Sequence, residues 1–360
     1  MKHTIRIALF VLSTLLLITL APVAAQDAPP PITLTLAAYS TPREVYGEVI
    51  PLFQALWQEE TGQQVIVQET YQGSGAVSRT IVGGFEADIA ALSLEADITR
   101  IVDAGLITHD WKDNDYQGFV STSLVILAVR PDNPFNITDW VDLVQPDLEV
   151  ITPNPATSGG AQWNVLAAYG AARRGHIPGY EATDEGATQF LRDLFTNVIA
   201  LDPDARASLL NFERGIGDVA ITYENEIYTG LAADSEYQLV RPTSTILIEN
   251  PVAVIDTYVD AHGTRDVAEA FVAFLWTPEV QTIFANYGYR SVNPDVAAEY
   301  QAEDGEAAIE VVTTDDEHVT FAPVEDLFTI EEFGGWGEAR TAFFGDEGIF
   351  TTLIAEVQGS

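Results

Sequence analysis

A serine and two glycines stand directly before an apolar, helix-forming run in this chain. Ser158, Gly159 and Gly160 precede a pattern that predicts a helix over 161–173. The first N–H groups of a helix have no partner within it, and glycine lets a ligand approach them closely. The helix dipole also favours negative charge at this end. The segment therefore predicts a cradle for a small oxyanion.

Residue types that support catalysis or metal binding are missing from the sequence or badly spaced. The chain has five scattered histidines without metal-ligand spacing, and it has no cysteine. It contains no Gly-x-Ser-x-Gly nucleophile elbow, P-loop or EF-hand loop. Four carboxylates could imitate an acid–base pair: Asp202, Asp204, Glu224 and Glu226. Carboxylates near helix starts, however, are ordinary partners of the helix dipole. We therefore expect a binding protein without catalytic residues, metal or cofactor.

The N-terminus has the order of segments that is typical of a secretory signal peptide. Two basic residues, Lys2 and Arg6, precede an apolar run over 7–20, and small residues follow at 22–25. The apolar run is shorter than the roughly 20 residues of a membrane span, and an uncleaved anchor is the alternative. We predict a signal peptide over 1–25 and a periplasmic or secreted protein. Without cysteine, no lipid anchor on an N-terminal Cys is expected.

The chain is strongly acidic, with a formal net charge of -38 from 54 Asp and Glu against 16 Lys and Arg. Nucleic acids and anionic membranes are recognised by basic residues, so nucleic acid is excluded as a partner and an anionic membrane surface is not expected. Salt screens surface charge over about 8–10 Å, so the acidity need not decide the chemistry inside a cleft. An exported chain without disulfides must be stabilised by its core, and this length suggests two domains.

Strands and helices alternate along the chain, which predicts a doubly wound α/β fold. Strands are expected at 32–38, 65–67, 87–94, 123–129, 149–151, 198–201, 218–223 and 245–255. Helices are expected at 43–60, 78–83, 97–104, 161–173, 186–196, 207–214, 264–276 and 278–286. The strands at 123–129 and 245–255 are candidate crossovers between lobes. We predict a discontinuous first lobe (26–125 and 245–360), an inserted second lobe (126–244) and an acidic loop over 295–320.

Five segments place hydroxyl groups, glycines or other polar residues where predicted strands end. They are Tyr39–Pro42, Gly73–Gly75, Ser158–Gly160, Asp202–Ser208 and Tyr223–Glu226. Ligands of open α/β sheets bind beyond the carboxyl ends of the strands. Each segment alone is explained by helix capping or by a turn. Five of them at equivalent sheet ends favour one shared ligand.

These segments resemble those of the periplasmic sulfate-binding proteins of ABC importers, which are type II solute-binding proteins. The resemblance runs from about Ile32 to the C-terminus and rests on Tyr39–Glu44, Gly73–Gly75, Phe85–Asp88, Val150–Pro155, Thr157–Gly160, Phe212–Asp218, Tyr223–Glu226 and Phe333–Trp336. It implies two lobes, each a mixed sheet flanked by helices, that close on the ligand by a hinge. It also implies a monomeric receptor that delivers sulfate to membrane permease subunits and catalyses nothing.

The resemblance implies which residues hold the anion. The ligand-binding residues would be Ser40, Thr41, Ser74, Ser158, Gly159, Gly160, Ala205 and Tyr223, with Arg43 and Arg206 outside direct contact. Ala205 would donate its backbone N–H, and Arg206 would pair with acidic neighbours. Three positions depart from the best-known members: Ser40 replaces Asp, Tyr223 replaces Trp, and Gln162 replaces Arg. A phenol O–H can still donate a hydrogen bond. Related thiosulfate receptors carry Asn at the second glycine, so Gly160 favours sulfate.

The alternative oxyanion ligands differ in whether they carry a proton at neutral pH. Sulfate is fully deprotonated at neutral pH and needs only donors, whereas phosphate keeps a proton that needs an acceptor. A donor-only pocket leaves that proton unpaired, at a cost of about 1–3 kcal/mol. Thiosulfate, phosphate and molybdate are the alternative oxyanions, and Asp202 or Asp204 facing the pocket would favour phosphate. The alternative from another class is a secreted hydrolase of sulfate or phosphate esters, which needs a positioned nucleophile with a base or metal.

Overall fold

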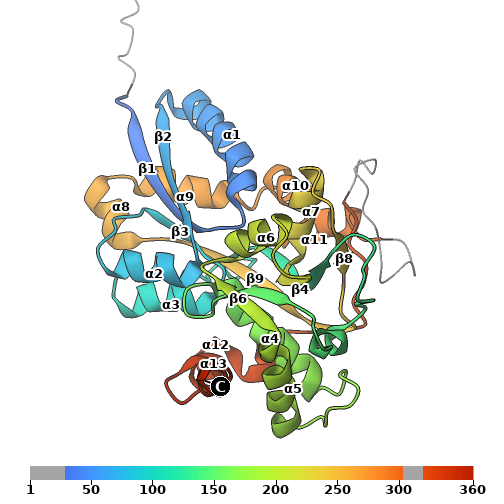
Figure 1. Ribbon diagram of the computed structural model, residues 1–360. Coiled ribbons are helices and arrows are strands. Elements are labelled where there is room, and N and C mark those ends of the chain that lie inside the picture. Colours follow the sequence, from blue (N-terminus) through green and yellow to red (C-terminus); the bar gives the residue numbers. More distant parts are fainter. Residues whose placement is uncertain (1–28, 303–318, 360) are drawn as a thin grey trace, which may run out of the picture.

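A computed structural model describes residues 29–302 and 319–359 of the chain (Figure 1). The predicted signal peptide over 1–25 and most of the predicted acidic loop over 295–320 lie outside these residues. The strands are β1 (Ile32–Tyr39), β2 (Val65–Gln72), β3 (Ile89–Ala91), β4 (Phe119–Val129), β5 (Val150–Pro153), β6 (Val198–Asp202), β7 (Val219–Tyr223), β8 (Gln238–Val240), β9 (Ser244–Val254) and β10 (Asp326–Phe328).

Helices flank these strands. They are α1 (Arg43–Thr61), α2 (Ser74–Val82), α3 (Glu95–Asp103), η1 (Trp140–Val144), α4 (Gly159–Arg173), α5 (Asp184–Thr196), α6 (Ala205–Glu213), α7 (Glu224–Ala232), α8 (Asp256–His262), α9 (Arg265–Phe274), α10 (Pro278–Asn286), α11 (Pro294–Glu299), η2 (Ile330–Phe333), α12 (Gly335–Ala339), η3 (Arg340–Phe344) and α13 (Ile349–Gly359). In the described ranges, no helix is both long and apolar enough to cross a membrane.

The sheet runs in the order β2-β1-β3-β9-β4-β7-β5-β6, with β8 on β4 and β10 on β9. Parallel pairing joins β1 to β2 and β3, and it joins β5 to β6 and β7. The contacts of β9 with β3 and β4, and of β4 with β7, are antiparallel. We refer to β1–β3 with their helices as the first lobe and to β5–β8 with theirs as the second lobe. The predicted α/β fold with a mixed sheet is confirmed.

Two long strands, β4 and β9, run from one lobe to the other. β4 pairs with β9 over 119–124 and then with β7 over 125–129. β9 pairs with β4 over 247–251 and then with β3 over 252–254. These are the two strands that the apolar runs at 123–129 and 245–255 predicted as crossovers. Their shared pairing places both connections side by side at the middle of the sheet.

Three elements differ from their predicted bounds. Helix α2 begins at Ser74, so this serine is the first helical residue and does not lie in the preceding loop. Strand β3 ends at Ala91, since only the Leu92 N–H still bonds β9, at the Pro251 carbonyl, before the chain turns into α3. Within the predicted acidic loop, 294–299 forms α11, whose start is capped by the Asn293 side chain. The shortening of β3 moves Ser93 into a loop, and that position matters for the site.

The C-terminal segment from β10 to α13 packs on the second lobe. The Phe343 ring meets the Tyr169 ring of α4 with centroids 4.7 Å apart, and Phe350 meets Phe195 of α5 at 4.9 Å. Figure 1 shows α12 and α13 beside α4 and α5. The prediction that all of 245–360 belongs to the first lobe does not fit this packing. Apolar contacts with α4 and α5 hold the segment there.

Arg174, directly after α4, forms ion pairs with Asp326 and Glu332 of this C-terminal segment, and the pair with Asp326 makes the contact sensitive to acid. Arg174 donates to both carboxylate oxygens of Asp326, at 2.5 and 2.7 Å. The hydrogen bond from Arg174 is the main reason why the pKa of Asp326 falls from 3.8 to about 2. A lowered pKa in the folded state adds stability above the ordinary pKa, and this stability is lost as the pH falls towards about 2.

We expect Asp326→Asn to lower the free energy of unfolding at pH 7 by about 1 kcal/mol, since the pair is partly open to solvent. The difference from the parent protein should shrink between pH 4 and pH 2, where the parent carboxylate takes up its proton. Thermal unfolding at several pH values measures this difference. A gap between the two proteins that stays constant down to pH 2 would contradict the assignment.

Candidate anion-binding site

The starts of three helices, α2, α4 and α6, meet at one place. Thr157, next to the α4 start, accepts a hydrogen bond from the Ala76 N–H of α2 at 3.2 Å. Its hydroxyl donates to the Pro203 carbonyl, two residues before α6, at 2.8 Å. A Cβ on Gly73, directly before α2, would collide with the Thr157 carbonyl. The three helix starts, each with backbone N–H groups that lack intrahelical partners, therefore lie against one another across both lobes.

Ser158 caps α4 and keeps a hydroxyl proton to donate. Its Oγ accepts from the Ala161 N–H at 3.4 Å, and the side chain is buried. A hydroxyl has one proton and two acceptor lone pairs, so a capping bond of this kind leaves the proton available. The next two residues, Gly159 and Gly160, are the first of the helix and contribute N–H groups without intrahelical partners. This start of α4 can therefore offer one hydroxyl and several backbone donors to an anion.

Only glycine fits at positions 159 and 160, because the opposite walls of the cradle lie close to the backbone there. A Cβ on Gly159 would lie 2.7 Å from the Ser93 Oγ, and one on Gly160 would lie 2.5 Å from the Tyr223 ring. A Cβ that lies less than 3 Å from another heavy atom forces the neighbouring group or the backbone to move. Ser93 comes from the first lobe and Tyr223 from the end of β7 in the second. Both walls of the cradle are thus within van der Waals reach of the α4 start.

Ser74 is buried in the same region, but its hydroxyl proton is already engaged. Its Oγ donates to the Asp97 carboxylate at 2.7 Å and accepts from the Ser93 N–H at 3.1 Å. Arg100 in turn donates to Asp97 at 2.6 Å. A hydroxyl with one proton cannot also donate to an anion. In this arrangement Ser74 can therefore offer only its backbone N–H, at the start of α2.

Ser93 is a residue of this region that the sequence reasoning missed, because it lay inside the predicted strand 87–94. Its Oγ lies 2.6 Å from the Tyr223 Oη, and its carbonyl accepts from the Trp163 Nε1 at 2.9 Å. Both hydroxyl groups are buried, and burial raises the pKa of Tyr223 well above its ordinary value. The signal that could have found Ser93 is a polar residue at the end of an apolar run, just before the acidic helix start Glu95–Asp97.

The first loop, at the end of β1, is buried beside Tyr223. The Tyr39 and Tyr223 ring centroids are 6.3 Å apart. Thr41 shares a hydrogen bond of 2.9 Å with the Tyr289 Oη, so its hydroxyl already has a partner. Ser40 is 7 % exposed. The buried Tyr39 Oη has no hydrogen-bond partner among the residues that the structure describes. Tyr39 belongs to one of the five predicted segments but was not among the predicted ligand-binding residues.

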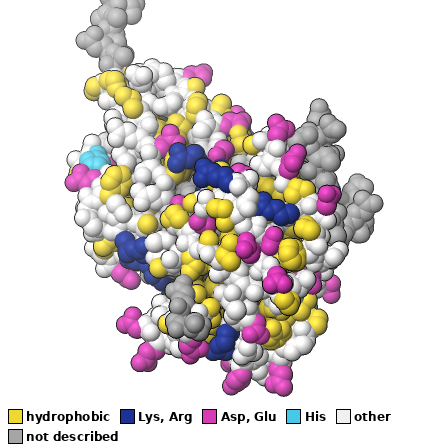
Figure 2. All heavy atoms as spheres, in the orientation of Figure 1, with side chains coloured by type: hydrophobic (Ala, Val, Ile, Leu, Met, Phe, Trp, Pro, Cys, Tyr) yellow, Lys and Arg dark blue, Asp and Glu magenta, His cyan; other side chains and the backbone are white. Residues whose placement is uncertain are grey.

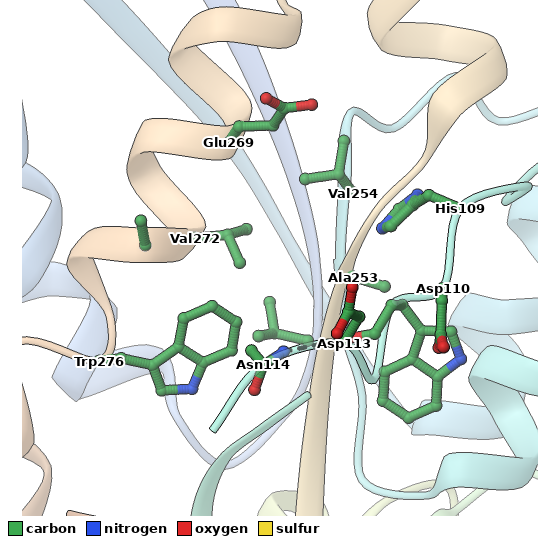
Figure 3. Close-up of a pocket in the computed structure, with 12 residues that line it drawn as sticks. His109, Asp110, Asp113, Asn114, Ala253, Val254, Glu269, Val272 and Trp276 are labelled. Atoms are coloured by element: carbon green, nitrogen blue, oxygen red, sulfur yellow. Dashed lines mark hydrogen bonds between the residues drawn. The ribbon is translucent and has the colours of Figure 1, made fainter. Parts of the chain in front are cut away.

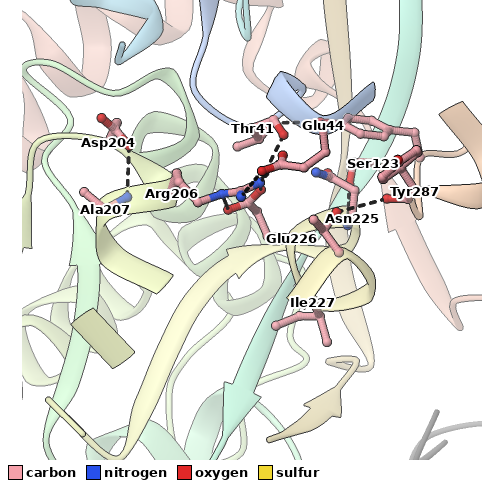
Figure 4. A network of polar contacts seen from close by, with 12 residues as sticks. Thr41, Glu44, Ser123, Asp204, Arg206, Ala207, Asn225, Glu226, Ile227 and Tyr287 are labelled. Atoms are coloured by element: carbon pink, nitrogen blue, oxygen red, sulfur yellow. Dashed lines mark hydrogen bonds and ion pairs between the residues drawn. The ribbon is translucent and has the colours of Figure 1, made fainter. Parts of the chain in front are cut away.

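Arg206 links the two lobes below this loop (Figure 4). Its guanidinium donates to Glu226 of α7 at 2.7 and 2.8 Å, to Glu44 of α1 at 2.7 and 2.9 Å, and to the Thr41 carbonyl at 3.2 Å. Burial raises the pKa of Glu226, although the Arg206 charge opposes this change. Burial lowers the pKa of Arg206, but the two carboxylates outweigh it and raise the value overall. The guanidinium is thus held by carboxylates and is not free for an anion.

The other predicted residues lie as follows. Ala205 is the buried first residue of α6. Arg43 stacks over the Tyr71 ring of β2 at 4.3 Å. Asp204 caps α6 by accepting from the Ala207 N–H at 3.0 Å (Figure 4). Asp202 accepts from Asn211, in the second turn of α6, at 2.7 Å, while its other oxygen is buried without a partner in the described ranges. This last oxygen is the feature that makes a protonated oxyanion worth testing.

A separate hollow in the first lobe does not involve these residues. Its lining includes His109, Asp113, Glu269 and Trp276, and none of the predicted ligand-binding residues (Figure 3). Across the described residues, no group of three or more His, Asp or Glu side chains is arranged to hold a metal ion. Of the predicted ligand-binding residues, five lie at the starts of α2, α4 and α6: Ser74, Ser158, Gly159, Gly160 and Ala205.

Comparison with known proteins agrees with this geometry. A family model described as bacterial extracellular solute-binding protein matches residues 34–290. The chain is 39% identical over 331 residues to a sulfate-binding protein of Synechococcus elongatus, which covers 91% of this chain and 88% of that protein. It is 38% identical over 330 residues to a sulfate-binding protein of Escherichia coli, with coverages of 89% and 93%.

A solved structure supports the same relationship. The sulfate-binding protein SubI from Mycobacterium tuberculosis superimposes with a TM-score of 0.72 and 36% sequence identity, over 85% of this chain and 97% of that one. Three findings agree on the family: the sequence match, the family model and the similarity to a solved structure. The chain belongs to the family of bacterial extracellular solute-binding proteins.

Proposed function

We propose that this protein is an extracytoplasmic sulfate receptor. It captures the anion between the two lobes and delivers it to the permease subunits of an ABC-type importer. The observation that carries the proposal is the meeting of three helix starts from both lobes around Ser158, Gly159 and Gly160. Identity of 38–39% to proteins named as sulfate-binding supports the choice of ligand. We further propose that the protein acts as a monomer, in the periplasm or outside the cell, and has no enzymatic activity.

The donors that we assign to the anion are mostly backbone groups. They are the N–H groups of Ser74, Gly159, Gly160 and Ala205, at the three helix starts, and the Ser158 hydroxyl. Helix starts place partial positive charge on the ligand without a counter-ion, so the acidity of the chain does not prevent binding. Ser40 and Thr41 close the pocket from the first lobe, and Arg43 and Arg206 support it from outside.

Ser93 and Tyr223 form a hydroxyl pair that supplies one more donor. Two hydroxyl groups have two protons, and the hydrogen bond between them uses one. The second proton is buried, where a donor without an acceptor is costly. We propose that this proton points to the anion.

Calorimetric titration with sulfate, thiosulfate, phosphate and molybdate tests the proposed ligand. We expect the tightest binding with sulfate, because the pocket offers donors and sulfate carries no proton. Tight phosphate binding without sulfate binding would mean that the unpartnered Asp202 oxygen faces the ligand as an acceptor. That result would overturn the assignment to sulfate. Failure of all four anions to bind would overturn the oxyanion receptor itself.

Ser93→Ala tests the hydroxyl pair. We expect sulfate binding to weaken about tenfold, the scale of one lost buried hydrogen bond, because the variant loses the partner that orients the Tyr223 phenol. Ser78→Ala is the matched control. Ser78 is also a buried serine near Asp97, but its hydroxyl donates to the Asp97 carbonyl at 2.7 Å and contacts no proposed ligand residue. Equal losses of affinity in the two variants would refute the role of the pair.

A further inference from the structure

Three arginines gather around Asp97, directly behind the proposed anion site. Asp97 is fully buried, and its Oδ2 accepts from the Ser74 hydroxyl at 2.7 Å. The Arg100 Nη1 is 2.6 Å from its Oδ1, and the Arg340 Nη1 is 4.0 Å from the same oxygen. Arg79 approaches from α2: its Nη1 is 3.3 Å from the position that a Cβ on Gly75 would occupy. All three guanidinium groups therefore lie close to the start of α2.

The charge of this group is not cancelled. Within the described part of the chain, Arg79 has no ion-pair partner, and its side chain is exposed. The Asp97 carboxylate is the one negative charge that Arg100 and Arg340 share. Burial, followed by repulsion from Arg100, lowers the pKa of Arg340, as expected where like charges crowd. In Figure 2 one dark blue patch lies over the region of α2 and α3.

The acidic residues beside these arginines do not outnumber the cations. The hollow beside α3 and α12 is lined by Glu95, Thr99, Arg100, Asp103, Trp336 and Arg340. Glu95 is paired with Lys112. With Asp97 and Glu249 counted, four cations (Arg79, Arg100, Lys112, Arg340) stand against four anions (Glu95, Asp97, Asp103, Glu249). In a chain with 54 acidic and 16 basic residues, such a local balance of charge is unusual.

We propose that Arg79, Arg100 and Arg340 form a basic patch that draws the dianion to the start of α2 and so speeds its association. The proposal rests on the proposed function, because it concerns how sulfate reaches that same site. A chain of net charge -38 repels a dianion at long range, most strongly at low salt. The patch offsets this repulsion near the start of α2. Arg79 contributes most because its exposed charge has no partner among the described residues.

The experiment measures the association rate of sulfate by stopped-flow tryptophan fluorescence at several ionic strengths. Trp163 lies at the site, where its indole donates to the Ser93 carbonyl. We expect Arg79→Gln to lower the association rate constant about threefold or more at low ionic strength, with the dissociation rate unchanged. Arg340→Gln should act in the same direction. The difference between parent and variants should fade as salt rises, because screening removes the steering.

Arg173→Gln is the matched control, since it removes the same charge from the opposite end of α4. A helix of 15 residues is about 22 Å long, which is more than two Debye lengths at physiological salt. At that ionic strength we expect its association rate to equal that of the parent. If Arg173→Gln slows association as much as Arg79→Gln, the effect comes from net charge and the patch has no role. A parent protein that binds no sulfate contradicts the proposed function, whereas binding at a rate that Arg79→Gln leaves unchanged contradicts only the steering.

Discussion

Replacing Gly160 with alanine should abolish high-affinity sulfate binding while the protein stays folded. The new Cβ would lie 2.5 Å from one carbon of the Tyr223 ring and 2.9 Å from its Oη. The buried ring must move, and with it the phenol proton and the Ser93 hydroxyl 2.6 Å away. Overpacking of this kind costs about 1–3 kcal/mol before any loss of ligand contacts is added. We expect the affinity to fall by about 100-fold or more when both costs combine.

Gly160→Ala should lower the sulfate affinity strongly while it changes the stability of the unliganded protein little. Alanine is favoured over glycine inside a helix by about 0.5–1 kcal/mol, which offsets part of the strain in the unliganded protein. Calorimetric titration gives the affinity, and thermal unfolding without ligand gives the stability. Gly47→Ala is the control, because Gly47 also lies in a helix but its Cβ would meet nothing within 4 Å. Parent-like sulfate affinity in Gly160→Ala would show that the Tyr223 wall is not part of the site.

Replacing Arg206 with methionine should produce the second large effect, on both stability and closure. Glu226 is fully buried, and Arg206 is the partner of its carboxylate. Removal of one member of a buried ion pair typically costs about 3–5 kcal/mol, because the other charge is left without compensation. The same change cuts the link from Glu44 of the first lobe to α6 and α7 of the second. We expect a marked fall in the unfolding temperature and about tenfold weaker sulfate binding.

Two further variants separate the effects of Arg206. Arg206→Met combined with Glu226→Gln removes the uncompensated charge, so most of the stability should return while the affinity stays low. Glu44→Gln removes the ion pair between the lobes but keeps the bond from Arg206 to the Thr41 carbonyl and the pair with Glu226. Since the Glu44 side chain is 34 % exposed, the variant should weaken binding with little change in stability. Affinity restored by the double variant would show that Arg206 stabilises the second lobe and does not hold the lobes together.

The fold was predictable because its main elements have strong local patterns. The apolar face of 43–60 and the helix at 278–286 match α1 and α10 closely, and the two long apolar runs proved to be β4 and β9. The C-terminal segment was not predictable in the same way. Its aromatic residues, such as Phe343 and Phe350, could pack on either lobe, and only the three-dimensional contacts with α4 and α5 decide between them.

The site was predictable in its helix starts but not in its hydroxyl groups. Glycine and serine before an apolar run carry their own signal, so Ser158, Gly159 and Gly160 could be found by inspection. Ser93 has a weaker signal, because the end of β3 depends on pairing with β1 and β9, which are distant in sequence. Likewise, Ser74 donates its proton to Asp97, a residue 23 positions away. Which hydroxyl proton is free for a ligand is a property of the folded network.

The packing of the C-terminal segment on the second lobe has a practical consequence. Ile32 begins the first strand of the first lobe, whereas α13 rests on α5 of the second, and Figure 1 shows them at opposite ends of the molecule. The hinge strands β4 and β9 therefore lie between the two ends of the described chain. Fluorophores attached near Ile32 and on α13 would be bound to different lobes, and energy transfer between them would change as the lobes close. Energy transfer between labels at the two ends of the chain would therefore report ligand binding without any rearrangement of the order of the sequence.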